Sequence, residues 1–362
     1  MYTAARGPAR GTVWLLAAGL VLLVACTPAA SSPTSPKPAS ERPPAAAVSS
    51  TATAAEQASG PPPEIRVGHG FAAEENLWLM AAKPELTPNQ GRAYTLTFTA
   101  FRGNADRLSA YEAGQIDAGT IAAPTAFFAA EQGLPMKLVA SIVREAHNPQ
   151  YHNTTYLALA ESGINSARDL RGKTIGIVDF KSATELWARA AVESAGLDPE
   201  RDVKYVVVPF PAMGESLHTR RIDVGAFPNP FYAAEKAKGG VVEAFTAKTG
   251  VPFDEELLLL FMRPEFISRN QTAVKAFLSD FVAATKWYLA NLKEARQILL
   301  DKKFVQTDPQ VYLEMQDWYR EPTGRITIDG MNREQDLLLK LGWQTKRIDV
   351  NELIDLSLLP PS

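Results

Sequence analysis

The sequence predicts an α/β protein made of two similar lobes, each a mostly parallel sheet flanked by helices. After residue 63, strand-like and helix-like segments alternate along the chain. In addition, "GQIDAGTIAAPTAFFAAEQG" (114–133) is similar to "RRIDVGAFPNPFYAAEKAKG" (220–239), which indicates an internal duplication. The chain has 362 residues, 46% of them hydrophobic, and is therefore large enough for two cores.

The first 25 residues are predicted to be a signal peptide rather than part of this fold. Arg6 and Arg10 precede the apolar run "VWLLAAGLVLLVA", which is too short for a membrane span. The tetrapeptide "LVAC" resembles a bacterial lipobox and implies a lipid anchor on Cys26, the only cysteine of the chain. An ordinary signal peptide that happens to contain a cysteine is the alternative. We expect an exported protein, lipid-anchored to the outer face of the cytoplasmic membrane or in the periplasm.

Residues 26–63 are predicted to form a flexible tether between the anchor and the folded region. They are rich in Ala, Pro, Ser and Thr and lack the apolar side chains that would offset the entropy of ordering. The folded region then divides into lobe 1, residues 64–156 plus 257–362, and lobe 2, residues 157–256.

Each lobe is predicted to run β-α-β-α-β-α-β. Besides the duplicated pieces, the elements expected in lobe 1 are strand 64–70, helix 75–82, strand 94–101, helix 104–114 and strand 136–142. Those expected in lobe 2 are strand 172–178, helix 182–196 capped by Ser182 or Thr184, strand 203–210, helix 211–221 and strand 241–246. Right-handed crossovers place the strands of each lobe in one parallel sheet.

Two segments are expected to form a two-stranded hinge between the lobes. Residues 154–162 would cross from lobe 1 to lobe 2, and 256–263 would cross back. A long helical segment from about 270 to 303 and the helices that follow would pack on lobe 1. Two lobes joined in this way describe a trap that closes on a ligand.

Several stretches resemble the periplasmic substrate-binding proteins of ABC importers (type II fold), within the family that carries sulfonates, taurine, nitrate or thiamine-related pyrimidines. They are "LSAYEAGQIDAGTIAAPTAFFAAEQGLPMKLVASI", "SGINSARDLRGKTIGIV", "AGLDPERDVKYVVVPF" and "DGMNREQDLLLKLGW". The resemblance covers about residues 64–355. It implies a two-lobed protein that captures a solute in the cleft and delivers it to a membrane permease.

The chain departs from that family in the loops that choose the ligand. It has Asp179-Phe180-Lys181-Ser182 where members often have Gly-Ser or Gly-Thr, and Arg102-Gly103 where they often have Ser-Gly. It has Phe227-Pro228-Asn229 where a Trp is common. These departures leave the identity of the ligand open.

Ligand-binding residues are expected beyond the carboxyl ends of the strands, where open α/β sheets bind ligands. These ends carry the loops 69–71, 101–104, 120–122, 179–182, 210–213 and 227–229. The candidate ligand-binding residues, with two near the hinge, are His69, Gly70, Phe71, Phe101, Arg102, Gly103, Asn104, Thr120, Ile121, Tyr151, His152, Asp179, Phe180, Lys181, Ser182, Phe210, Met213, Phe227 and Asn229.

Arg102 and Lys181 are the cations expected to hold an acidic group, since a guanidinium fork suits a carboxylate or sulfonate. The alternative is that both are solvated charges. Asp179 is expected to cap the helix that follows it or to pair with Lys181, or else to accept a bond from an N–H donor of the ligand. Glu74 and Glu75 are expected to compensate the helix dipole, although one could face the cleft.

The phenylalanines at the strand ends indicate a cleft able to hold an apolar or aromatic body. We expect no metal, because the four histidines and one cysteine show no metal-ligand spacing, and no other cofactor. A net charge of −3 without a basic run gives no sign of nucleic-acid binding.

The function that follows is an extracytoplasmic solute-binding lipoprotein of an ABC importer, a monomer that binds a small organic anion such as a sulfonate or carboxylate. A pyrimidine or other nitrogen heterocycle, held by Asp179 and Asn229, is the alternative ligand. A ligand-sensing domain is a further alternative. An enzyme on the same fold is disfavoured by the export signal and by the missing cysteine-rich motif of pyrimidine-forming relatives.

Overall fold

A computed structural model describes residues 60–361, which form two five-stranded sheets flanked by helices and confirm the predicted α/β class. The predictions for the signal peptide, for Cys26 and for the tether up to residue 59 lie outside the described residues. Within residues 60–361, no helix is long and apolar enough to cross a membrane.

The first sheet has the order β2-β1-β3-β10-β4. Strands β1, β2 and β3 pair in parallel, whereas β10 is antiparallel to both of its neighbours, so that β4 again runs parallel to β3. The strands of this sheet are β1 (Glu64–His69), β2 (Thr95–Ala100), β3 (Ala118–Ala122), β4 (Lys137–Glu145) and β10 (Glu255–Met262).

The second sheet repeats this arrangement in the order β7-β6-β8-β5-β9. Here β5 is the antiparallel strand, and it pairs with β8 and β9. The strands of this sheet are β5 (Thr155–Leu159), β6 (Thr174–Ile177), β7 (Lys204–Val207), β8 (Val224–Phe227) and β9 (Val241–Thr246). Since β1 to β4 correspond to β6 to β9, and β10 to β5, the duplication expected from the sequence is present in the topology.

Each sheet therefore receives its antiparallel strand from a segment that has just crossed between the halves. The crossings are made by residues 146–154 and 247–254, and β5 and β10 belong to the sheets that they enter. From the sequence, lobe 2 is expected to begin at residue 157 and lobe 1 to resume at residue 257. Strand β5 begins at Thr155 and β10 at Glu255, two residues earlier in each case. The lobe boundaries themselves stay a prediction.

The repeated Ile-Asp-x-Gly motif has the same structural task in both sheets. Asp117, before β3, accepts hydrogen bonds from the backbone of Arg66 (3.2 Å) and from its guanidinium. Asp223, before β8, likewise accepts a bond from the backbone N–H of Thr174 (2.7 Å). The glycines of the motif lie opposite glycines of the neighbouring strand, in the pairs Gly68–Gly119 and Gly176–Gly225.

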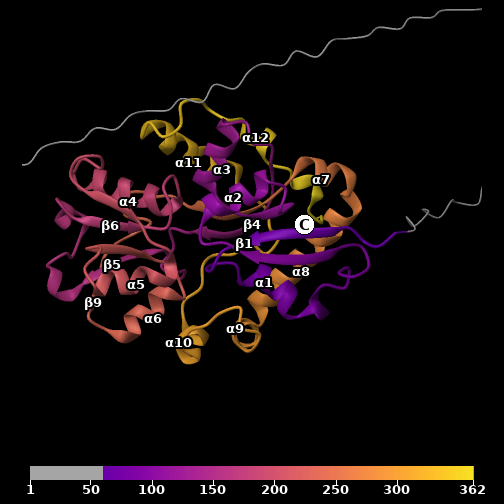
Figure 1. Cartoon of the computed structure of the whole chain (residues 1–362), viewed down its shortest axis with the longest axis horizontal. Coiled ribbons are helices and arrows are strands. Elements are labelled where there is room, and N and C mark those ends of the chain that lie inside the picture. Colours follow the sequence, from indigo (N-terminus) through magenta and orange to yellow (C-terminus); the bar gives the residue numbers. More distant parts are fainter. Residues whose placement is uncertain (1–59, 362) are drawn as a thin grey trace, which may run out of the picture. The chain divides into compact units, whose positions relative to one another are not determined.

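Helices cover both faces of each sheet (Figure 1). In that view α2 and α3 lie above the first sheet with α1 and α8 below, and α4 lies above the second sheet with α5 and α6 below. The helices of these two halves are α1 (Glu75–Ala82), α2 (Asn104–Glu112), α3 (Ala123–Glu131), α4 (Ala183–Ser194), α5 (Phe210–His218) and α6 (Phe231–Lys238).

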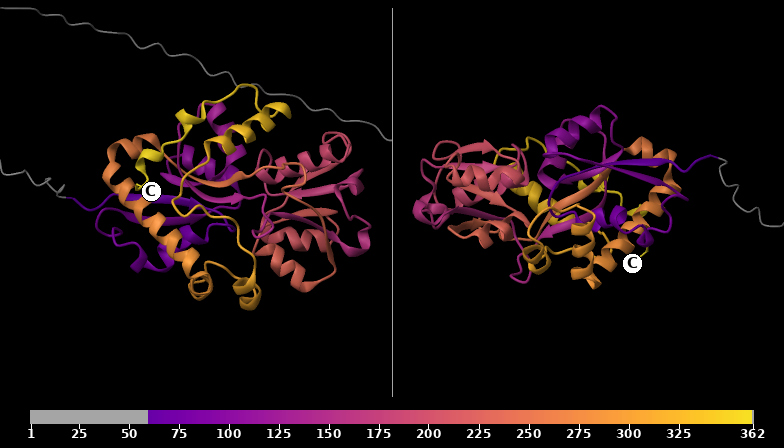
Figure 2. Two further views of the ribbon diagram at one scale, coloured as in Figure 1. Left: turned by 180° about the vertical axis from the view of Figure 1, so that it is seen from behind. Right: turned by 60° about the horizontal axis from the view of Figure 1, so that its bottom comes forward.

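The C-terminal part of the described chain packs mainly on the first half, as expected. Figure 2 shows the C-terminal segments lying over the elements of the first sheet, and α11 contacts α3 and β10. The long helix expected at 270–303 is divided at Asn291, whose side-chain amide donates to the carbonyl of Trp287 (2.9 Å). The helices of this part are α7 (Pro264–Arg269), α8 (Gln271–Ala290), α9 (Leu292–Asp301), α10 (Pro309–Glu314), α11 (Ile328–Lys340) and α12 (Val350–Leu353).

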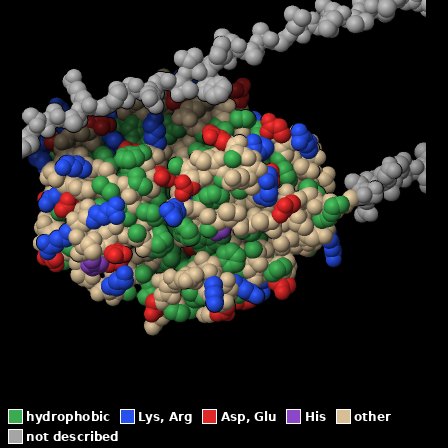
Figure 3. Space-filling view, viewed as in Figure 1, with side chains coloured by type: hydrophobic (Ala, Val, Ile, Leu, Met, Phe, Trp, Pro, Cys, Tyr) green, Lys and Arg blue, Asp and Glu red, His purple; other side chains and the backbone are tan. Residues whose placement is uncertain are grey.

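The core is continuous between the two halves. One cluster of buried hydrophobic side chains includes Val67 of β1, Ile175 of β6 and Trp187 of α4. Figure 3 shows hydrophobic side chains gathered near the middle of one face, with charged side chains spread around them. The two sheets are therefore joined through shared buried side chains.

Candidate functional site

A cavity lies where the carboxyl ends of strands from both sheets meet. It is bordered by Gly70 after β1, Ala122 at the end of β3, Val178 after β6 and Pro228 after β8. Its empty volume is about 610 Å³, including space open to solvent. The position is the one expected for ligand binding in open α/β sheets.

The two sides of the cavity differ in chemistry. Within the described residues, the charged side chains that line it are Glu74, Arg102 and Arg107, all from the first half. The other lining residues of the first half are Gly70, Phe71, Ala72, Ala73, Gly103, Asn104, Ala122, Leu257 and Leu258. The second half, with the crossing residue Thr154, contributes Val178, Ser182, Ala183, Thr184, Trp187, Phe210 and Pro228.

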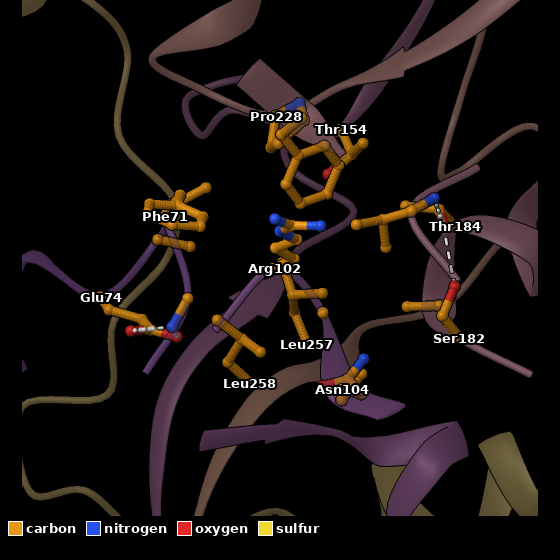
Figure 4. Close-up of a pocket in the computed structure, with 18 of the residues that line it drawn as sticks. Phe71, Glu74, Arg102, Asn104, Thr154, Ser182, Thr184, Pro228, Leu257 and Leu258 are labelled. Atoms are coloured by element: carbon orange, nitrogen blue, oxygen red, sulfur yellow. Dashed lines mark hydrogen bonds between the residues drawn. The ribbon is translucent and has the colours of Figure 1, made fainter. Parts of the chain in front are cut away.

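Arg102, which follows β2, is the exposed cation of the site. Figure 4 shows its guanidinium in the middle of the pocket, with Pro228 and Thr154 above it and Leu257 below in that view. Among the described residues, Arg102 takes part in no ion pair within 4.0 Å. Its fork is therefore available to an acidic group that enters from solvent.

Glu74 forms a buried part of the cavity wall and is only 1% exposed. Both carboxylate oxygens accept the backbone N–H of Gly70 at 2.9 Å, and one also accepts the hydroxyl of Thr120 at 2.6 Å. These bonds satisfy the carboxylate and tie the end of β1 to the middle of β3. Of the two acids expected to compensate the helix dipole, Glu74 is thus the one that faces the cavity, whereas Glu75 pairs with Arg320.

On the opposite side, the hydroxyl groups of the second half are engaged by their own backbone. Ser182 is the N-cap of α4, as the sequence suggested; its hydroxyl accepts the N–H of Glu185 and donates to the carbonyl of Asp179 (2.7 Å). Thr184 accepts the N–H of Val178 at 3.0 Å. The indole N–H of Trp187 donates to Glu255 at 3.1 Å, which fixes the ring against the cavity. This side therefore offers mainly apolar surface.

Asp179 bridges the two halves beside the cavity rather than lining it. One of its carboxylate oxygens accepts the backbone N–H of Asn104 at 2.7 Å and, more weakly, that of Ala105 at 3.4 Å. These N–H groups belong to the first turn of α2, which has no side-chain cap of its own. Asp179 therefore caps a helix of the other half, whereas the helix that follows it, where its cap was expected, is capped by Ser182. Burial raises the pKa of this carboxyl group above its ordinary value.

Part of the predicted site is brought together by the structure. The predicted residues that line the cavity are Gly70, Phe71, Arg102, Gly103, Asn104, Ser182 and Phe210. Ala122 and Pro228, from two of the predicted loops, line it as well. Phe180 and Lys181 are exposed outside the lining; Lys181 lies over the ring of Phe128, with its Nζ 4.7 Å from the ring centroid.

Other predicted residues lie beneath the cavity. Thr120, Ile121, Met213 and Phe227 are almost fully buried, and Phe101 packs against the core of the first half. His69 also lies outside the lining, where its Nδ1 accepts the indole N–H of Trp78 at 3.1 Å. At a strand end, successive side chains point alternately to the core and to the cleft. For this reason only some residues of each predicted loop line the cavity.

The residues expected near the hinge lie in a separate place. Tyr151 and His152 border a second hollow that is more open to solvent, beside which His152 accepts the backbone N–H of Asn229 (3.2 Å). Burial lowers the pKa of His152 to about 3, so that its ring is neutral. The side chain of Asn229 donates to the carbonyl of Gln316 (2.8 Å). These contacts join the crossing segment to the loop after β8.

Sequence reasoning missed several lining residues, among them Arg107, Thr154, Trp187 and Leu257. Each lies inside an element or on a crossing rather than in a strand-end loop. Trp187 and Leu257 read as ordinary core residues from their apolar surroundings. Arg107 reads as one more charged residue of a surface helix, and no local signal distinguishes it.

No cluster of three or more His, Cys, Asp or Glu side chains within residues 60–361 is arranged to hold a metal ion. The chemistry available in the cavity is instead that of recognition: two guanidinium groups, one satisfied carboxylate and an apolar wall.

Comparisons with known proteins fit this geometry. The fold is shared with the ligand-binding component of an ABC-type import system from Staphylococcus aureus, solved with zinc bound (TM-score 0.68, 17% identity, 82% of this chain and 97% of that one). It is also shared with the alkanesulfonate-binding protein SsuA from Xanthomonas axonopodis pv. citri, bound to MOPS (TM-score 0.67, 18% identity, 82% and 99%). The two-lobed fold is therefore that of periplasmic binding proteins.

Sequence comparison also identifies the family of the chain. The model of the NMT1-like family matches residues 58–300, and the protein belongs to that family. The nitrate/nitrite binding protein NrtA from Synechococcus elongatus is 24% identical over 255 residues, which cover 66% of this chain. The match spans only 56% of that relative's length.

Proposed function

We propose that this protein is the extracytoplasmic solute-binding component of an ABC importer and that it captures a small organic anion between its two halves. The observation that carries the proposal is the guanidinium of Arg102, which lines the cavity without an ion pair among the described residues. The cavity is also lined by Trp187, Phe210 and Pro228 of the second half, which suit an apolar or aromatic body. The ligand class is therefore a sulfonate or carboxylate with an apolar portion.

The relatives support an anionic ligand. One solved structure of the same fold is that of an alkanesulfonate-binding protein bound to MOPS, and the curated relative is a nitrate/nitrite binding protein. A nitrogen heterocycle is less well supported, because Asp179 is engaged by Asn104 and Asn229 is engaged by Gln316, both outside the lining.

The remaining parts of the proposal concern how the protein works in the cell. A lipid anchor on Cys26 would hold the protein, as a monomer, at the outer face of the cytoplasmic membrane or in the periplasm. From there it would deliver its ligand to an ABC permease, as a binding protein and not an enzyme. A ligand-sensing domain would use the same cavity but would require a signalling partner instead of a permease.

Native mass spectrometry of the full chain, purified in mild detergent, tests the proposal, followed by a thermal-shift panel of sulfonates and carboxylates with their neutral amides. We expect a retained organic anion, or stabilisation by an acid and not by its amide. A panel in which only neutral or cationic compounds bind would refute the anionic ligand. If no compound of the panel binds, the result would favour a binding protein that has lost its transport function.

A further inference from the structure

Arg107 is a buried guanidinium on the wall of the cavity with incomplete bonding. It is 4% exposed, and Nη1 donates to the carbonyl of Thr120 and, at 3.4 Å, to Oδ1 of Asn104. Its Nε has no hydrogen-bond partner. Within the described part of the chain, no carboxylate oxygen lies within 4.0 Å of its nitrogen atoms. A buried cation in this state lacks the directly bonded carboxylate that such groups ordinarily have.

Two carboxylates act on Arg107 through their negative charge, and both already accept hydrogen bonds from other donors. Glu74 accepts the N–H of Gly70 and the hydroxyl of Thr120, and Asp179 accepts N–H groups of the first turn of α2. Burial lowers the pKa of Arg107 despite these charges, since the charged form has lost its water. Arg320, which is also buried, shows the contrast: it is bonded directly to both Glu75 and Asp317.

The backbone in front of Arg107 is kept open by a glycine. A Cβ on Gly70 would lie 3.0 Å from Nη2 of Arg107 and 3.3 Å from a carboxylate oxygen of Glu74. Gly70 itself lines the cavity. A side chain at this position would therefore cover the guanidinium, and the glycine leaves it uncovered toward the cavity.

We propose that Arg107 is the anchor that binds the acidic group of the ligand, with Asn104 orienting its guanidinium and Arg102 closing over the ligand from the exposed side. This deepens the proposed function and rests on it. The cavity is lined by the positive charges of Arg102 and Arg107 and the negative charge of Glu74. One net positive charge fits a ligand with a single carboxylate or sulfonate, and a planar fork suits either group.

The test uses isothermal titration of the full chain in detergent with benzoate and benzenesulfonate, and with benzamide as the neutral probe. Arg107→Met is expected to weaken binding of both acids roughly 10- to 100-fold, the range for a lost bond to a charged group, and to leave benzamide unchanged. The acid affinity of Arg107→Lys should lie between those of the wild type and Arg107→Met, because a lysine keeps the charge without the fork. Gly70→Ala should weaken both acids by obstructing the guanidinium.

Arg296→Lys is the matched control. Arg296 is 1% exposed, its Nε and Nη2 have no hydrogen-bond partner, and it lies outside the cavity. If incomplete bonding of a buried arginine affected only folding, both lysine variants would lose thermal stability and neither would lose affinity. That result would contradict the role of Arg107 as the anchor. The same conclusion would follow if Arg107→Lys bound the acids as tightly as the wild type while Arg102→Met lost acid binding. If neither these acids nor any other acid of the thermal-shift panel binds the wild type, the proposed anionic ligand fails, which is a different outcome from acid binding that survives Arg107→Met.

Discussion

The two walls of the cavity derive from equivalent parts of a duplicated fold, yet they carry different chemistry. The wall of the first half has Arg102 after β2, whereas the wall of the second half has Phe210 after the corresponding strand β7. By contrast, the sheet motif is unchanged, since Asp117 and Asp223 accept the same kind of backbone bond. The comparison teaches that the interior kept its common design while the strand-end loops diverged, one toward charge and the other toward apolar surface.

The largest effect expected from this comparison concerns two phenylalanines of the second half. Phe227 is 1% exposed in the core, whereas Phe210 is half-buried on the cavity wall. Phe227→Ala should lower the free energy of unfolding by about 3–5 kcal/mol. Phe210→Ala should lower stability by less and should instead weaken the binding of a ligand with an apolar portion. Urea denaturation and titration calorimetry measure the two effects; equal losses of stability would mean that Phe210 is also a core residue.

Next in size is an effect of pH on the segments that join the two halves. Glu145 ends β4 in a fully buried position, where the N–H and hydroxyl of Thr154 donate to it at 3.0 and 2.7 Å. Burial raises the pKa of Glu145 from 4.5 to about 7. The folded protein thus holds this proton more tightly than the unfolded chain, and stability is expected to fall as pH rises between these values, by roughly 3 kcal/mol.

Urea denaturation at pH 4.5 and pH 7.5 checks this prediction, with Glu145→Gln as the comparison. Burial raises the pKa values of Glu255 and Glu334 as well, so the difference between wild type and variant is the relevant quantity. The variant should show a smaller decline with pH. Identical declines in both proteins would assign the titration to the other acids.

A smaller effect is expected from the exposed cation of the first wall. Arg102→Met should weaken an acidic ligand about tenfold, at the low end for a bond to a charged group because water screens this position. Binding of the corresponding amide and the thermal unfolding temperature should not change. Calorimetry with an acid and its amide measures this; equal losses for both would show that Arg102 acts by packing and not by charge.

The smallest effect is expected from the cation of the second half. Lys181 is exposed, lies over the ring of Phe128 and stands outside the cavity lining. Lys181→Ala should therefore change stability by less than about 1 kcal/mol, the scale of an exposed cation–π contact, and acid affinity by less than about twofold. A tenfold loss of acid affinity would show that Lys181 contributes a positive charge to the site from the second half. The division into a charged and an apolar wall would then be wrong.

The fold could be predicted because its signals are local and repeated. Helix Glu75–Ala82 and strand Val241–Thr246 have the bounds expected from the sequence, and the Ile-Asp-x-Gly motif marks the same strand in both sheets. Strand β7 ends earlier than expected, at Val207, because Pro209 has no N–H to donate and α5 begins at Phe210. Such differences concern ends of elements, where propensity is weakest.

The site could be predicted only in part. Strand-end position pointed to Gly70, Arg102 and Phe210, but it could not tell which side chains turn into the core, as Phe227 does. Arg107 lies within α2, and its guanidinium is held at the cavity by its bond to the carbonyl of Thr120 in β3. That contact depends on the tertiary packing of a helix on a sheet, which no sequence pattern encodes.

The measurement that tests the central claim most directly is a crystal structure of the protein with a bound aromatic sulfonate or carboxylate. We expect the acidic group within hydrogen-bond distance of Arg102 and Arg107, and the apolar body against Phe210 and Trp187. An acidic group held by the second half, or a ligand bound outside this cavity, would contradict the division of the two walls into charge and apolar cover.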